Sequence, residues 1–92
     1  MGQMHEHQGA LDLALAAYRR AVYLDRSFVP GLIGIGDIWR QMGRTRDASR
    51  SYETALRQLA LLPATARVVG AEGATASELV ALVLQQLRAL GS

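Results

Sequence analysis

The stretch GLIGIGDIW, residues 31–39, has two interpretations that lead to different proteins. Three glycines within six residues suggest a loop that holds a phosphate group. The same stretch places Leu32, Ile35 and Trp39 at i, i+3 and i+7, the spacing of one helix face. A phosphate loop needs a strand directly before its glycines, but Pro30 interrupts the preceding RSFVP. The spacing is also G-x-x-G-x-G rather than G-x-G-x-x-G, and the chain has no lysine. We therefore interpret these residues as part of a helix.

An internal repeat with an offset of 34 residues supports the helical interpretation. Gly9 aligns with Gly43, and at the same offset Ala14 falls on Ala48, Tyr18 on Tyr52 and Ala21 on Ala55. Within each copy, Ala, Tyr and Ala recur at i, i+4 and i+7, again one helix face. A helix-turn-helix period of about 34 residues is the signature of the tetratricopeptide repeat. The chain resembles that family over residues 9–59.

The resemblance implies an all-α fold, a tetratricopeptide-like helix-turn-helix solenoid. It would hold one full repeat, a partial repeat and a C-terminal capping helix within one domain, residues 1–92. The expected parts are a truncated first helix at 1–8, the second helix of the partial repeat at 9–28, the full repeat at 29–62 with its turn at Gly43, a linker at 63–74 and the capping helix at 75–90. Small residues are expected where helices approach closely, at Gly36, Ala48 and Ala55. Bulky core residues are expected at Leu32, Trp39, Tyr18 and Tyr52.

The tail after the full repeat predicts a linker and a last helix. The segment Ala64–Gly73 is rich in Ala, Gly and Val and reads as a flexible connection. Thr75 and Glu78 form a T-x-x-E capping box at the start of the helix. The apolar stripe of that helix, which we expect to cover the open face of the last repeat, is Leu79, Val83, Leu87 and Leu90.

A narrower resemblance rests on the junction and the tail. The motifs are Tyr23-Leu24-Asp25 with Phe28-Val29, then Leu59 with Leu62-Pro63, then Gly73 with Thr75-Ala76 and Leu79. Together they are similar to the carboxy-terminal tetratricopeptide tail of CheR-type chemotaxis methyltransferases. Those enzymes transfer a methyl group from S-adenosylmethionine to receptor glutamates, through an upstream α/β domain that this sequence does not contain.

The resemblance therefore implies a non-catalytic interaction or regulatory domain, a fragment of a longer and cytoplasmic methyltransferase, with no catalytic, cofactor-binding or metal-binding residue of its own. Expected partners are a receptor, a response-regulator domain or the catalytic domain of the same enzyme. A generic tetratricopeptide adaptor from another pathway is the alternative. A nucleic-acid or nucleotide binder is a more remote alternative.

The family resemblance also indicates a binding groove, because the first helix of each repeat lines the concave face in this family. Transferred by position, the groove-facing residues are Pro30, Ile33, Gly34, Asp37, Arg40 and Gln41. Family members that grip a terminal carboxylate use Lys and Asn at such positions. This chain has Ile33, Gly34 and Asp37 instead, so the groove suits a peptide or an amphipathic helix better than an acidic tail. The alternative is that these residues form only a solvated face.

Composition limits the other classes of function. The net charge is +2, and the ten basic residues, all arginine, are dispersed rather than gathered in the stripe of a nucleic-acid binder. There is no cysteine for a disulfide framework, and no apolar run approaches the roughly 20 residues that cross a bilayer. His5 and His7 could suggest a metal, but we interpret them as part of a solvated terminus.

The incomplete first repeat predicts self-association. Because most of one helix is missing from that repeat, we expect an uncovered apolar flank that includes Leu11, Leu15 and Val22. The expected result is a homodimer, or a weak equilibrium between copies.

Overall fold

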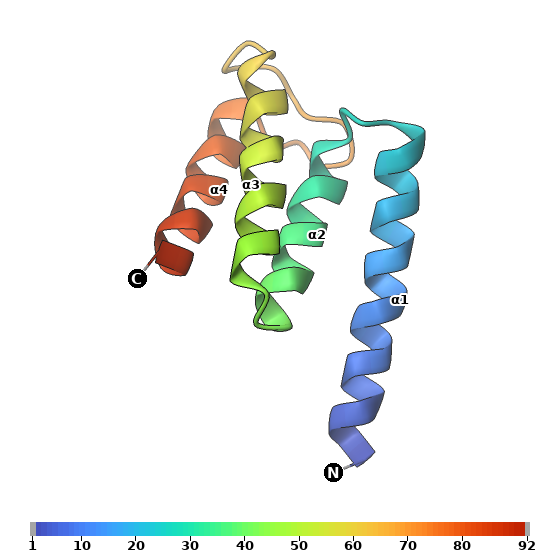
Figure 1. Cartoon of the computed structure of the whole chain (residues 1–92). Coiled ribbons are helices and arrows are strands. Elements are labelled where there is room, and N and C mark those ends of the chain that lie inside the picture. The colour runs from blue at the N-terminus through green and yellow to red at the C-terminus, as the bar shows by residue number, and fades with distance from the viewer. Residues whose placement is uncertain (1, 92) are drawn as a thin grey trace.

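The computed structural model describes residues 2–91, with side chains for residues 9–91. Within this range the chain forms four α-helices and no β-strand, which confirms the all-α class. The helices are α1 (Gly2–Leu24), α2 (Val29–Gln41), α3 (Thr45–Ala60) and α4 (Ala76–Gly91). They lie side by side in chain order, and the lower end of α1 projects beyond α2 and α3 (Figure 1). α2 packs between α1 and α3, and α4 covers the other side of α3.

The first helix differs from the sequence prediction. We expected a break at Gly9 between a truncated helix at 1–8 and a second one at 9–28, but α1 is continuous from Gly2 to Leu24. Gly9 keeps a helical backbone, and no side chain of residues 9–91 lies within 4 Å of the place where its Cβ would be. Nothing packs there to force a turn. Residue 1 and the side chains of residues 2–8, His5 and His7 among them, lie outside the described part.

The turn at Gly43 is as predicted, and its geometry explains why α2 stops. Gly43 has φ +78°, a left-handed conformation that glycine adopts without steric cost. The N–H of Gly43 donates to the carbonyl of Arg40 at 3.0 Å, and the N–H of Arg44 donates to that of Trp39 at 2.8 Å. This pair of bonds is a Schellman motif. It satisfies carbonyl groups at the end of α2 and reverses the chain into α3.

The contact between α2 and α3 forms the tightest part of the core. Ala48, Tyr52 and Ala55 of α3 are 0% exposed. A Cβ at Gly36 would lie 2.7 Å from the ring of Tyr52, which is closer than real Cβ atoms approach. Leu32 is also buried, at 6% exposure. The predicted close approach at Gly36, Ala48 and Ala55 is confirmed.

The apolar face of α1 is packed rather than open. Leu15 is buried, and Leu11 and Val22 pack against the same cluster with Ile35 and Ile38 of α2. The prediction that Leu11, Leu15 and Val22 form an uncovered flank is wrong, because α2 itself covers them. The exposed apolar residues of α1 lie elsewhere, with Leu13 76%, Tyr23 82% and Leu24 77% exposed.

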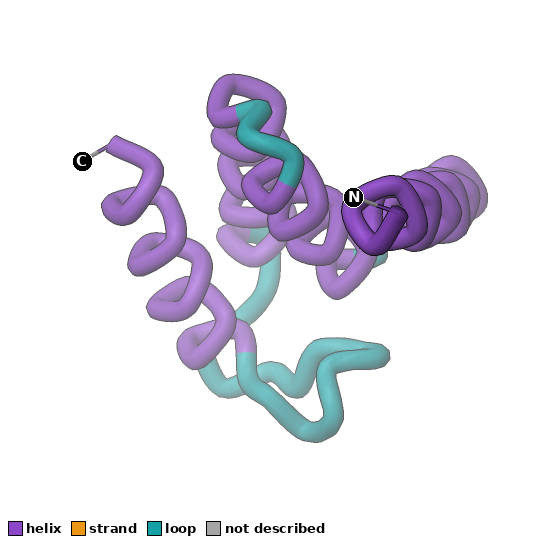
Figure 2. The backbone as a smooth tube through the Cα atoms, turned by 90° about the horizontal axis from the view of Figure 1, so that it is seen from below, coloured by secondary structure: helices purple, strands orange, loops and turns teal. Residues whose placement is uncertain are grey.

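The segment between α3 and α4 is a folded loop rather than a flexible linker. The N–H of Val68 donates to the carbonyl of Ala74 at 2.9 Å, and the N–H of Ala76 donates to that of Ala66 at 2.8 Å. Val68 is 8% exposed and belongs to the cluster that Leu32 and Leu59 also join. Figure 2 shows the loop on one side of the helix layer. The predicted flexibility of Ala64–Gly73 is therefore not supported by its hydrogen bonding.

The predicted capping box opens α4. The N–H of Glu78 donates to Thr75 Oγ1 at 3.3 Å, and the N–H of Thr75 donates to Glu78 Oε1 at 3.3 Å. Both donors would otherwise lack a partner at the start of the helix. Leu79 and Val83 are buried, and Leu87 and Leu90 pack beside Val83. The predicted stripe faces the core.

We expect Gly36→Leu to lower the free energy of unfolding by about 1–3 kcal/mol, because the added side chain overpacks the fully buried ring of Tyr52. Gly9→Ala is the matched control in an open helical position, where alanine should instead stabilise by up to about 1 kcal/mol. Urea unfolding of both variants measures the difference. Equal effects of the two substitutions would contradict the packing at Gly36.

Candidate functional site

A hollow of about 280 Å³ lies on one side of α2. We call it the α2 groove. Its floor is α2, one wall is Tyr18 of α1, and the other walls are the 70–72 turn of the folded loop and two leucines of α4. The lining residues are Tyr18, Pro30, Ile33, Gly34, Asp37, Gly70, Ala71, Glu72, Leu79 and Leu82. The surface is mostly aromatic and aliphatic, with carboxylates at two positions.

The structure brings most of the predicted groove residues together. Pro30, Ile33, Gly34 and Asp37 line the α2 groove, but Arg40 and Gln41 do not. Arg40 and Gln41 belong to the last turn of α2, and both are exposed. The groove therefore ends about one helical turn before the helix does.

We expected Gly34 to face the groove without cover, but the structure shows otherwise. A Cβ at Gly34 would lie 2.7 Å from the ring of Tyr18, so the tyrosine covers it. Tyr18 was also expected in the core, as the repeat equivalent of Tyr52, but it is 38% exposed. The difference follows from the neighbours: Tyr52 lies between α2 and α4, whereas Tyr18 packs against α2 on one side only. Its ring thus becomes a wall of the site.

The opposite side of the groove was missed by the sequence reasoning. Leu79 and Leu82 come from α4, and Glu72 comes from a loop that was expected to be a passive linker. Glu72 adopts φ +54°, between Gly70 at φ +81° and Gly73 at φ +87°. The letters G-A-E-G do signal a turn. They do not reveal that the turn folds back onto the first turns of α2.

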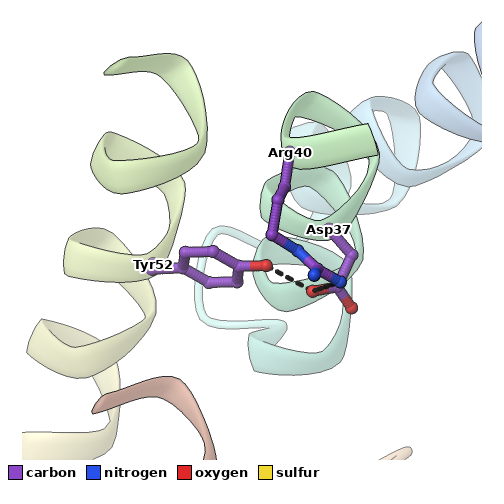
Figure 3. A network of polar contacts seen from close by, with 3 residues as sticks. All are labelled: Asp37, Arg40 and Tyr52. Atoms are coloured by element: carbon purple, nitrogen blue, oxygen red, sulfur yellow. Dashed lines mark hydrogen bonds and ion pairs between the residues drawn. The ribbon is translucent and has the colours of Figure 1, made fainter. Parts of the chain in front are cut away.

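Asp37 connects the groove to the core through a short polar network (Figure 3). The hydroxyl of Tyr52 donates to Asp37 Oδ1, and Arg40 lies 4.0 Å from the same oxygen. Burial, then the hydrogen bond to Asp37 and its negative charge, raise the pKa of Tyr52 from 10.0 to about 12, although Arg40 opposes the shift. The buried phenol thus remains protonated and holds the carboxylate in place.

Trp39 is a packing residue rather than an open binding platform. It is half-buried and contacts the clusters on both sides of α2. The guanidinium of Arg19 lies 5.4 Å from the centre of its ring, and that of Arg44 lies 5.1 Å away. Both distances are within the range of cation–π attraction. These contacts tie α1 and the α2–α3 turn to the end of α2.

A second hollow, of about 310 Å³, lies beside the N-terminal end of α2 and is lined by no residue of that helix. It is formed by the α1–α2 junction, the end of α3 and the folded loop, and its lining includes Phe28, Leu61 and Val69. It is slightly larger than the α2 groove, but it contains none of the predicted site residues. Within residues 9–91, no group of three or more His, Cys, Asp or Glu side chains could hold a metal ion.

Comparison with protein-family models, with curated proteins and with solved structures finds no match. The tetratricopeptide and CheR-type likenesses therefore stay predictions, carried by the residues and geometry above. Among the helices described for residues 2–91, none has the length and apolar character that a membrane span requires.

We expect Tyr52→Phe to lower the free energy of unfolding by about 1–2 kcal/mol, because Asp37 loses a hydrogen bond to a buried donor. The loss should also shrink at alkaline pH. The folded-state pKa of Tyr52 is raised, so its contribution is complete below pH 10.0 and is lost as the pH rises to about 12.

Urea unfolding at about pH 9 and about pH 11 measures this dependence. Tyr23→Phe is the control, because Tyr23 is 82% exposed. If Tyr52→Phe showed the same destabilisation at both pH values, the raised pKa of Tyr52 would be wrong.

Proposed function

We propose that the chain is a non-catalytic protein-interaction domain that holds a peptide or an amphipathic helix in the α2 groove. The observation that carries the proposal is the coincidence of two independent results. Six residues were selected by position in the repeat, and four of them, Pro30, Ile33, Gly34 and Asp37, line one hollow. A concave surface with apolar walls and few polar groups is the usual form of a binding site.

We also propose that the helices form a tetratricopeptide-like solenoid with one full repeat at 29–62, a partial repeat and a capping helix. The side-by-side order of the helices supports this arrangement (Figure 1). So does the packing of Tyr52 on Gly36, two residues that the repeat places on facing helices. Such solenoids commonly bind their partners on the concave face.

The lining residues favour a helical or extended segment with apolar side chains as the ligand. Ile33, Leu79 and Leu82 provide the apolar contacts, and the ring of Tyr18 provides a flat wall. Amphipathic helices bind such grooves through side chains spaced at i, i+3 or i+4 and i+7. A hollow of about 280 Å³ has room for two or three such side chains and not for a whole folded domain.

The parent protein that fits the junction and tail motifs is a cytoplasmic, CheR-type chemotaxis methyltransferase. The capping box at Thr75 and Glu78 supports the tail part of that resemblance. In such a protein the groove would dock a receptor, a response regulator or the catalytic domain itself. The upstream sequence of the parent gene decides between this origin and a generic adaptor: a domain that binds S-adenosylmethionine favours the first.

The groove proposal predicts different effects for two similar leucines of α4. Leu82 is 41% exposed and lines the groove, whereas Leu84 is 39% exposed and does not. Helical peptides selected from a displayed library against the wild-type chain should bind Leu84→Glu normally. They should lose binding to Leu82→Glu by about tenfold or more, because a charge then replaces an apolar contact.

Titration calorimetry with the selected peptides measures both variants, and thermal melts check that each is folded. Peptides that bind Leu82→Glu as well as they bind the wild type would place the ligand elsewhere.

We further propose that copies of the chain associate weakly through the exposed face of α1. Leu13 and Leu24 are eleven positions apart, about three helical turns, so they share one face of the helix. They are 76% and 77% exposed. A contiguous exposed apolar patch commonly marks an interaction surface, and we propose that these two leucines belong to one. This face replaces the Leu11, Leu15 and Val22 flank that the sequence suggested.

Light scattering over a wide dilution series is expected to show an average mass that rises with concentration. The double variant Leu13→Glu, Leu24→Glu should remain monomeric, because charge on this face prevents apolar contact. Leu61→Glu is the control, since Leu61 is 78% exposed at the end of α3. A wild-type chain that is monomeric at every concentration would refute the association.

A further inference from the structure

The α2 groove is acidic as well as apolar. Two carboxylates line it, Asp37 from α2 and Glu72 from the folded loop, and no arginine does. Arg40 approaches Asp37 from outside the groove, but the separation is 4.0 Å and both side chains are partly exposed. Such a pair contributes little. A groove that is both acidic and apolar favours a ligand that carries both cationic and apolar side chains.

Asp37 has free capacity to bind a cation. Both of its partners, the hydroxyl of Tyr52 and the guanidinium of Arg40, are on Oδ1. Oδ2 has no hydrogen bond or ion pair with any residue whose side chain the structure describes. The side chain is 39% exposed and lines the groove. The bond from the buried phenol holds the carboxylate in its orientation.

Glu72 has no ion pair or hydrogen bond with another side chain in the range 9–91. Its side chain is exposed. Its backbone is left-handed, with φ +54°, a conformation that glycine or asparagine adopts more often than glutamate. The neighbouring hydrogen bonds from Ala71 N–H to Val68 and from Ala74 N–H to Ala71 fix this turn. A second carboxylate is thus presented by a well-ordered segment.

The wall formed by Tyr18 suits a cation too. Its ring is 38% exposed and covers Gly34 at the floor of the groove. An arginine or lysine side chain beside an aromatic ring gains a cation–π attraction. The same chain already holds Arg19 and Arg44 over Trp39 in this way. Ile33 and Leu82 remain for apolar neighbours of the cation.

We infer that the occupant of the α2 groove is an amphipathic helix that places arginine or lysine against the carboxylates of Asp37 and Glu72, with apolar side chains on Ile33 and Leu82. This inference rests on the proposed binding function. Charge-assisted hydrogen bonds to these carboxylates make the groove selective for a cationic side chain. An acidic or phosphorylated segment is repelled by the same pair.

The test uses a displayed library of 15-residue amphipathic helices, in which the polar positions vary among Arg, Lys, Gln, Glu and Ala. Peptides selected on the wild-type chain should be enriched in Arg or Lys at one position. Replacement of that cation by Gln should weaken binding by about tenfold, the usual scale for a charge-assisted contact. Binding should also weaken as salt is raised.

Glu72→Gln should weaken binding of the cationic peptide by about tenfold. It should leave binding of the peptide with Gln in place of the cation unchanged, since only the cation contacts this carboxylate. Glu53→Gln removes an exposed acid outside the groove and is the matched control for net charge. Equal losses for Glu72→Gln and Glu53→Gln would overturn the inference.

Two other outcomes separate this inference from the proposed function. If the selected peptides lose binding to Leu82→Glu and yet show no enrichment of Arg or Lys, the groove binds helices and the cation inference is wrong. If selection yields no peptide whose binding depends on Leu82, both the inference and the groove function fail.

Discussion

The contact between Tyr52 and Gly36 connects the core to the candidate site. The ring is 0% exposed and occupies the space that a Cβ at position 36 would need, so α2 and α3 are held at close distance. The hydroxyl of the same residue donates to Asp37, one position further along α2. One side chain therefore both fixes the spacing of the two helices and orients the carboxylate that faces the groove. The stability of the core and the geometry of the site depend on each other here.

The second wall of the groove depends on the same core from the other side. Val83 is 0% exposed and packs with Ala48 and Tyr52, which sets α4 against α3. With α4 anchored there, Leu79 and Leu82 line the groove beside α2, and the loop before α4 lies on one side of the helix layer (Figure 2). The hydrogen bonds of that loop then fix where Glu72 lies. A helix that covers the core also completes the site.

The sequence alone predicted the helices better than it predicted the site. The spacing of Gly36, Ala48, Tyr52 and Ala55 determined one complete helix pair, because close packing there allows only small residues facing large ones. Local chemistry also predicted the Gly43 turn and the Thr75 cap, since both are satisfied within a few residues. The break at Gly9 was wrong because Gly9 keeps a helical backbone instead of the left-handed one of Gly43, so α1 continues through it. An alignment of repeats predicts which residue occupies an equivalent position, but it does not predict which segments pack around that position.

Only part of the groove was predicted, because the repeat does not show which segments surround a position. The α2 residues follow from helix periodicity, but Tyr18 was assigned to the core because its repeat equivalent, Tyr52, is buried between two elements. Tyr18 has α2 on one side only, so an identical residue in an equivalent position became a partly exposed wall. Glu72 belongs to a loop outside the repeat, where no periodicity applies. The aromatic wall thus arises where a repeat position has different neighbours, and the second carboxylate arises outside the repeat pattern.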